Sequence, residues 1–146
     1  MNGAHVERWL DCHRAYARLR FVLNEELGLH HGVDADDLAL LHLLAQSADG
    51  ALAFADLAAA LGASGAALLR RLRPLQKVGL LDCDGALHAR RVTLRAAGLR
   101  LVHTARDTVG AVLEGATSHA PAGSWLAPPD FSPAAPAPPA PASSSR

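Results

Sequence analysis

The fold of this chain is decided by residues 64–79, SGAALLRRLRPLQKVG, which form one predicted amphipathic helix. At about 100° per residue, apolar side chains gather on one face and cations on the opposite face. The apolar face contains Leu68, Leu72, Leu75 and Gly79. The cationic face contains Ala66, Arg70, Arg73 and Lys77. One side of this helix suits a protein core and the other suits an anionic partner.

The preceding residues 54–62, FADLAAALG, predict a shorter helix that ends in glycine. Two short helices joined by a glycine-containing turn are the outline of a helix-turn-helix, whose second helix enters the major groove of DNA. We therefore expect a helix-turn-helix over residues 54–79. Ser64 is expected to N-cap its second helix and to donate a hydrogen bond to a phosphate.

The charge distribution also favours DNA. The 146 residues have a formal net charge of zero. Residues 1–60, however, carry four Lys/Arg against nine Asp/Glu, whereas residues 64–106 carry nine against two. A basic segment in a neutral protein fits localised phosphate contact, with an affinity that falls as salt rises.

Two further helices are predicted before the helix-turn-helix. The first covers about residues 5–27 and is broken by the sequence GLHHG at residues 28–32. The second begins after Asp34, which is expected to cap it, and Asp37 three residues on completes a capping box. This helix runs to Ser47, where the sequence ADG stops it.

The rest of the chain predicts a hairpin, a long helix and a tail. Residues 80–94 form the expected wing, with its turn at Asp84–Gly85, because Asp-Gly is a favoured two-residue hairpin turn. A last helix over about residues 95–117 has a continuous apolar stripe. Residues 119–146, rich in Pro, Ala and Ser, are expected to be a disordered tail. The fold class is therefore mainly α with a small β-hairpin, in one domain over residues 1–118.

Two motifs resemble winged helix-turn-helix regulators of the MarR family. Residues 72–81, LRPLQKVGLL, resemble the L-x-P-L-x-x-x-G-L ending of that family's recognition helix. Residues 92–101, VTLRAAGLRL, are similar to its V-x-L-T-x-x-G-x-x-L entry into the dimerisation helix. The similarity covers about residues 6–113, and it implies that Pro74 bends the recognition helix without ending it.

The resemblance implies a homodimer that interlocks through the helices at residues 5–27 and 95–117. It also implies transcription regulation at a pseudo-palindromic operator in double-stranded DNA, by a repressor that a small aromatic acid-like ligand releases. The apolar stripe of the last helix supports a dimer independently, because it is longer than a small wing domain can cover. The alternative is a monomer that buries the stripe against its own first helix.

The residues expected to contact DNA lie on the cationic helix and in the wing: Ser64, Ala66, Ala67, Arg70, Arg73, Lys77, Arg90 and Arg91. Arg70 is the candidate for reading a guanine, and the two alanines for contacting thymine methyl groups. In the tight hairpin, Arg90 would lie about five residues, or ~15 Å, back from the tip. A longer loop over residues 84–89 would restore its reach, and the sequence allows both registers.

Two kinds of signal are considered for the regulator. A small organic acid would occupy a cleft whose candidate lining residues are Trp9, His13, Tyr16, Arg20 and His42, with Arg or His holding the carboxylate. Cys12, with Tyr16 four residues later, resembles the spacing in the family's peroxide sensors. A buried and inert role for Cys12 is favoured instead, because free cysteines are most often core residues.

Other functions are disfavoured by what the sequence lacks. It contains no nucleophile–base set, phosphate loop or closely spaced metal-ligand motif, so neither an enzyme, a cofactor nor a metal site is expected. No run approaches about 18 apolar residues, so we expect a cytoplasmic protein without a membrane partner. The rival hypothesis is a winged-helix protein-interaction module that docks an acidic partner.

Overall fold

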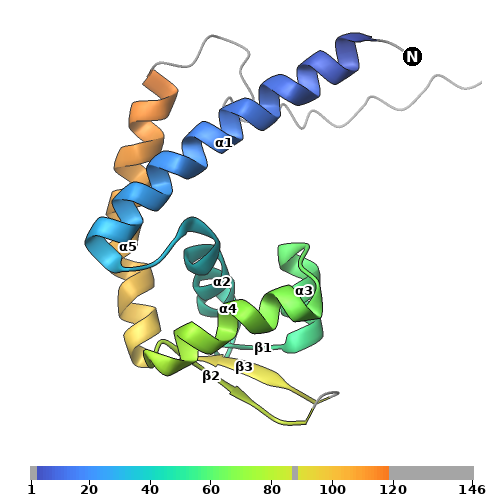
Figure 1. The fold of residues 1–146 in the computed structure, drawn as a ribbon. Helices are drawn as coiled ribbons and strands as arrows, with labels where there is room; N and C mark the ends of the chain where they lie inside the picture. The colour runs from blue at the N-terminus through green and yellow to red at the C-terminus, as the bar shows by residue number, and fades with distance from the viewer. Residues whose placement is uncertain (1–2, 87–88, 119–146) are drawn as a thin grey trace, which may run out of the picture.

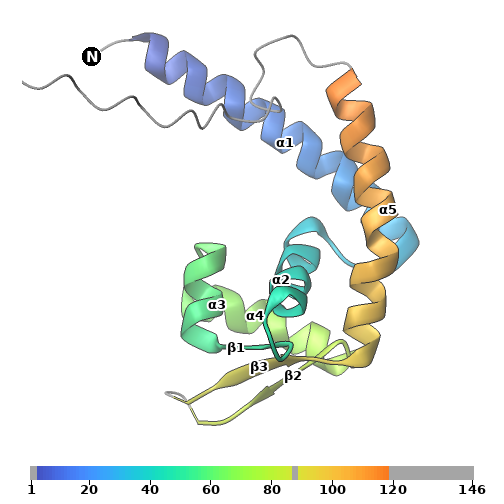
Figure 2. The same cartoon turned by 180° about the vertical axis from the view of Figure 1, so that it is seen from behind.

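The computed structural model describes residues 3–86 and 89–118, so the expected tail lies outside the described residues. The elements follow in the order α1 (Gly3–His31), α2 (Ala35–Gln46), β1 (Ala51–Ala53), α3 (Phe54–Leu61), α4 (Gly65–Lys77), β2 (Leu81–Asp84), β3 (Arg91–Leu94) and α5 (Ala96–Ser118). Figures 1 and 2 show one lobe made of α2, α3, α4 and the sheet. The helix α5 extends out of this lobe, and α1 crosses α5. The N-terminal part of α1 then points away from the lobe. The predicted fold class, mainly helical with a small antiparallel sheet, is confirmed.

The expected break of the first helix at Gly28 is wrong, because α1 continues to His31. A glycine inside a helix costs only about 1 kcal/mol relative to alanine, which surrounding contacts offset. One such contact is at the last turn, where His31 Nε2 lies 2.9 Å from Thr108 Oγ1 on α5. The helix ends at Gly32, whose φ of 69° is in the left-handed region that glycine tolerates.

The predicted capping box at the start of α2 is confirmed. The Asp34 side chain accepts a hydrogen bond from the Asp37 N–H at 2.7 Å, and the Asp34 N–H donates to Asp37 Oδ2 at 3.4 Å. Such a cap contributes about 1 kcal/mol to helix stability. The box fixes the first turn of α2, where several ionic contacts converge.

The sheet has one strand more than the sequence predicted. Its order is β1-β3-β2, antiparallel throughout, and the unpredicted β1 pairs Ala51 with Thr93. Three residues of sequence ALA have no alternating pattern, so only the pairing with β3 makes them a strand.

The predicted two-residue turn of the wing at Asp84–Gly85 does not form, so this prediction is wrong. Asp84 pairs with Arg91, so the strands extend past the predicted turn position and the register is close to the longer alternative. This register places fully buried Leu81 opposite Leu94, and Cys83 opposite fully buried Val92. The tighter turn would leave Val92 and Leu94 without partners on β2, so core burial sets the register and overrides the local turn preference.

The core lies between the helices and the sheet of the lobe. Its largest members are aliphatic side chains contributed by α2, α3, α4, both wing strands and α5: Leu40, Leu41, Leu44, Leu57, Leu68, Leu72, Leu81, Val92 and Val102. Burying each such side chain contributes about 1.5–3 kcal/mol. The predicted apolar face of α4 is confirmed, since Leu68, Leu72 and Leu75 are all buried.

Gly98 determines how α5 leaves the wing. A Cβ at this position would lie 2.2 Å from the Leu80 carbonyl oxygen and 2.6 Å from Leu94 Cδ1. The same Leu80 carbonyl accepts a hydrogen bond from the Arg95 N–H at 3.0 Å. The first turn of α5 is therefore pressed directly against backbone.

Among the described residues, no helix is both long and apolar enough to cross a membrane.

Candidate nucleic-acid interface

The start of α4 has the geometry of a capped, exposed helix N-terminus. Gly62, with φ 60° and ψ 29°, ends α3 in the left-handed region and allows a sharp turn. Ser64 then adopts an extended conformation, and its Oγ accepts a hydrogen bond from the Ala67 N–H at 3.2 Å. The predicted N-cap is confirmed. Pro74 lies inside α4, as expected, without ending it.

The cationic face of α4 is exposed and its charges are not neutralised within the chain. Arg70, Arg73 and Lys77 are exposed, as is Ala66, whereas Ala67 is half-buried. In the ranges 3–86 and 89–118, none of the three cations forms an ion pair. This face therefore presents three free positive charges along one side of a short helix.

Arg71, on the same helix, has the opposite environment. Its Nη1 donates to Asp34 Oδ1 at 2.9 Å and to Asp37 Oδ1 at 2.8 Å, and its Nη2 donates to Asp36 Oδ2 at 2.7 Å. Sequence analysis did not single out Arg71. Two features of the sequence could have indicated it. Arg71 lies just off the cationic face of its helix, and three aspartates cluster at the start of another helix.

The acidic groups around Arg71 titrate differently. Burial opposes ionisation of Asp34, but the Asp37 N–H and the Arg71 guanidinium outweigh burial and lower the pKa of Asp34. Burial raises the pKa of Asp37, despite its hydrogen bond from Arg71. Burial opposes the charge of Arg71, yet its carboxylate partners prevail and raise the Arg71 pKa. Of Asp34 and Asp37, Asp34 is therefore the better stabilised in its charged form.

The wing arginines are engaged at the loop end of the wing strands, where Arg91 pairs with Asp84. Arg91 forms an ion pair with Asp49, in the segment between α2 and β1. The guanidinium carbon of Arg90 lies 5.6 Å from the centre of the Phe54 ring, and the Arg90 carbonyl accepts a hydrogen bond from the Phe54 N–H at 2.9 Å. The Phe54 ring also lies against α4, because a Cβ added to Gly65 would be 3.5 Å from this ring. Phe54 thus joins the loop end of β3 to the first residue of α4.

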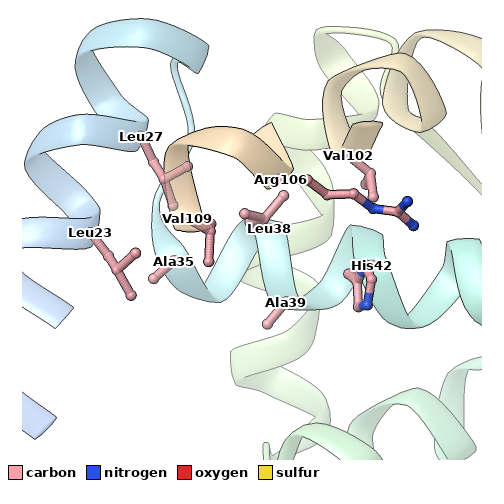
Figure 3. A pocket seen from close by; sticks show the side chains of 9 residues that line it. All are labelled: Leu23, Leu27, Ala35, Leu38, Ala39, His42, Val102, Arg106 and Val109. Atoms are coloured by element: carbon pink, nitrogen blue, oxygen red, sulfur yellow. The ribbon is translucent and has the colours of Figure 1, made fainter. Parts of the chain in front are cut away.

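A cavity of about 300 Å³ lies between α1, α2 and α5. Seven of its lining residues are apolar: Leu23, Leu27, Ala35, Leu38, Ala39, Val102 and Val109. The other two are His42 and Arg106, which Figure 3 shows together at one end, with Leu23 and Leu27 at the other. An apolar cavity with a cation at one end suits a small molecule with one anionic group. Arg106 was not predicted, although it lies one turn from Val102 in the apolar stripe of α5.

Comparison with known proteins gives matches among solved structures. No family model and no curated protein matches this chain. A MarR-family transcriptional regulator from Streptomyces coelicolor, solved in complex with DNA, has a TM-score of 0.73 at 17% identity, over 84% of this chain and 79% of that chain. AbsC, a second MarR-family regulator from that organism, has a TM-score of 0.72 at 17% identity, over 83% of this chain and 84% of that chain. This chain has the MarR fold.

A third match with the MarR fold comes from Mycobacterium tuberculosis. This MarR-family protein, solved in complex with p-aminosalicylic acid, has a TM-score of 0.59 at 25% identity, over 75% of this chain and 83% of that chain. The fold that the two sequence motifs imply is therefore confirmed. The contacts of individual residues in this chain with DNA and ligand stay predictions.

The five residues expected to line one cleft do not gather at a single site within the described residues. Of these five residues, only His42 lines the cavity between α1, α2 and α5. Arg20 donates to Asp36 at 2.6 Å, and Trp9 stacks on His13 with ring centres 5.5 Å apart. Trp9, His13 and Tyr16 are exposed in the N-terminal half of α1. Figure 1 shows that this end of α1 extends away from the lobe. The sequence pattern placed them on one helix face, but it did not reveal that this face leaves the lobe.

The expectation of a buried Cys12 is also wrong, because Cys12 is exposed in the N-terminal half of α1. Its redox role stays a prediction. Cys83 is half-buried in β2, where burial raises the pKa of its thiol. Both cysteines are free.

Proposed function

We propose that this chain is a MarR-family transcriptional regulator that binds double-stranded DNA through α4. The observation that carries the proposal is the contrast between the cations of the lobe. Arg71, Arg91 and Arg95 are each paired with aspartate, whereas Arg70, Arg73 and Lys77 have no acidic partner within the described part of the chain. A row of unneutralised cations beside an exposed helix N-terminus suits the phosphates that flank a groove.

We assign recognition of the DNA base sequence to the first two turns of α4. Arg70 can reach a guanine edge with two hydrogen bonds, and Ala66 and Ala67 can contact thymine methyl groups. Ser64, Arg73 and Lys77 would hold phosphates. Arg90 and Arg91 remain candidates for phosphate contacts at the loop end of the wing strands, at the expense of their present partners Phe54 and Asp49.

A homodimer is proposed from the exposed apolar face of α1. Phe21 is 66% exposed, Trp9 63% and Val6 54%, which is unusual for large apolar side chains on a helix that extends away from its own domain. A second copy of the chain would cover this face, because closed two-fold pairs are the commonest assembly of soluble proteins. Two copies of α4 would then address two half-sites of a pseudo-palindromic operator.

The cavity is proposed as the effector site of a repressor. Its apolar lining accommodates an aromatic ring, and Arg106 can pair with a carboxylate at the end where His42 also lies. The complex of the Mycobacterium tuberculosis protein with p-aminosalicylic acid supports this ligand class. Binding of a small aromatic acid would release the protein from DNA.

The experiment is selection of duplexes from a random pool by the full chain, followed by footprinting of the selected sequence. We expect protection of a pseudo-palindrome, an affinity that falls steeply with salt, and loss of protection on addition of salicylate. Failure to enrich any sequence would overturn sequence-specific DNA binding and favour the protein-interaction module. Retained protection at saturating salicylate would overturn only the effector assignment.

A further inference from the structure

One carboxylate oxygen connects the extended helix α1 to the cationic helix α4. Asp36 Oδ2 accepts a hydrogen bond from Arg20 Nη2 at 2.6 Å and another from Arg71 Nη2 at 2.7 Å. Arg20 belongs to α1, Asp36 to the first turn of α2, and Arg71 to α4. Two guanidinium groups from helices far apart in the sequence therefore share a single acceptor atom.

The first turn of α2 is held by α1 through a second contact. Asn24, one turn after Arg20 on the same side of α1, accepts the Ala35 N–H on its Oδ1 at 2.9 Å. This bond satisfies one of the backbone donors that a helix leaves unpaired at its start. A movement of α1 relative to α2 would therefore break two polar contacts together.

Arg71 fixes α4 from the other side of the same turn. It contacts Asp34, Asp36 and Asp37, so both the position of α4 and its rotation about its own axis are constrained. Arg70 is displaced from Arg71 by about 100° around the helix. The direction of Arg70 is consequently set by where Arg71 is held.

We propose that Asp36 is a positioning residue for DNA binding, which transmits the placement of α1 to the DNA-facing side of α4. This inference rests on the proposed function. The cavity between α1, α2 and α5 is lined by Leu23 and Leu27 of α1 and by Ala35 of α2. We expect a ligand there to move α1 relative to α2, the two elements that Asp36 and Asn24 join. Effector binding would thereby reach α4 through Asp36.

The test exploits the sign of a charge change. Asp36→Asn removes a negative charge, which by simple electrostatics strengthens DNA binding. The proposal predicts the reverse, roughly tenfold weaker binding to a duplex selected by the wild-type chain, in the range of known coupling effects. Asp82→Asn is the matched control. Asp82 also forms an ion pair, with Arg95 at 2.5 Å, and its side chain is 33% exposed, as is that of Asp36.

The α1 side of the bridge has its own variant and control. Arg20→Gln is expected to weaken DNA binding by a similar factor. Arg18→Gln removes the same charge from an exposed α1 residue that forms no ion pair within the described ranges, and should leave affinity nearly unchanged. If Arg20 and Arg71 act through one oxygen, the losses in Arg20→Gln and Arg71→Gln will not add in the double variant.

A second measurement keeps the test independent of DNA. Hydrogen exchange of the backbone amides in residues 65–71 should quicken in Asp36→Asn and Arg20→Gln and stay unchanged in both controls. Faster exchange without any selectable duplex would support the link while overturning the proposed function. Unchanged exchange, unchanged or tighter DNA binding by Asp36→Asn, or additive losses in the double variant would each overturn the role of Asp36.

Discussion

Arg70 and Arg71 are adjacent on α4, yet Arg71 contacts three aspartates of the lobe whereas Arg70 is exposed to solvent. The pair divides two tasks between neighbouring residues of one type. Arg71 attaches the helix to its domain, and we propose that Arg70 contacts DNA. Because they have opposite environments, substitutions at Arg70 and Arg71 are expected to fail in different ways.

Arg70→Ala is expected to weaken binding to the selected duplex by about 1–3 kcal/mol, the discrimination given by one bidentate guanine contact. Binding to random duplexes should fall much less. Arg73→Ala, a phosphate candidate, should weaken both equally and reduce the salt slope by about 1. Fluorescence anisotropy titrations at several salt concentrations measure both effects. Equal losses on the two duplexes in Arg70→Ala would refute a base-reading role.

Gly98→Ala is expected to destabilise the fold by about 1–3 kcal/mol or more, as for other overpacked sites. Its Cβ would meet the Leu80 carbonyl oxygen at 2.2 Å, and backbone cannot yield easily. Gly28→Ala is the control, because a Cβ there meets nothing within 4 Å and α1 is continuous at that point. It should stabilise by up to about 1 kcal/mol. Urea unfolding at one fixed protein concentration compares the two, and equal stabilities would contradict the packing argument.

Phe21→Glu is expected to turn the proposed dimer into a monomer, since it places a charge on a large exposed apolar residue of α1. Val78→Glu is matched in exposure, 67% against 66% for Phe21, but lies at the C-cap of α4. Sedimentation velocity should show a dimer for the wild-type chain and for Val78→Glu. A Phe21→Glu chain that still sediments as a dimer would place the interface elsewhere.

Arg106→Gln is expected to weaken salicylate binding by about 1.5–3 kcal/mol, the value of a charge-assisted hydrogen bond. DNA affinity without ligand should remain close to that of the wild-type chain. Arg100→Gln removes a charge from the same helix at an exposed position that does not line the cavity. Calorimetric titration of each variant with salicylate makes the comparison. Equal ligand affinities in both variants would exclude Arg106 as the anion partner.

Asp34→Asn is expected to reduce stability at neutral pH by up to about 1 kcal/mol, the scale of a partly exposed ion pair. Asparagine retains the capping oxygen, so the loss reports the charge. The pKa of Asp34 is lowered on folding from the ordinary 3.8, so this stabilisation is present above pH 3.8 and disappears as pH falls through the lower folded value. Unfolding curves of both chains should therefore converge in acid. A difference that persists there would show that the carboxylate charge is not its source.

Local features of this chain could be predicted from sequence, and features that depend on distant segments could not. The two faces of α4, the Ser64 cap and the Asp34 capping box each depend on residues within one or two turns. The strand β1 and the wing register depend on pairing across the sheet. Arg106 and the three-aspartate contact of Arg71 depend on how helices pack, which periodicity alone does not encode.

The close approach of Gly98 to the Leu80 carbonyl fixes the direction in which α5 leaves the wing, so a small tilt there produces a large displacement at the other end of the helix. The 23 residues of this helix span about 34 Å, so a tilt of about 10° at its first turn shifts the far end by about 6 Å. In the proposed two-fold dimer, such a tilt would also change the separation of the two recognition helices. The half-site spacing of the proposed dimer would then depend on the packing at Gly98, remote from the bases that α4 is proposed to read.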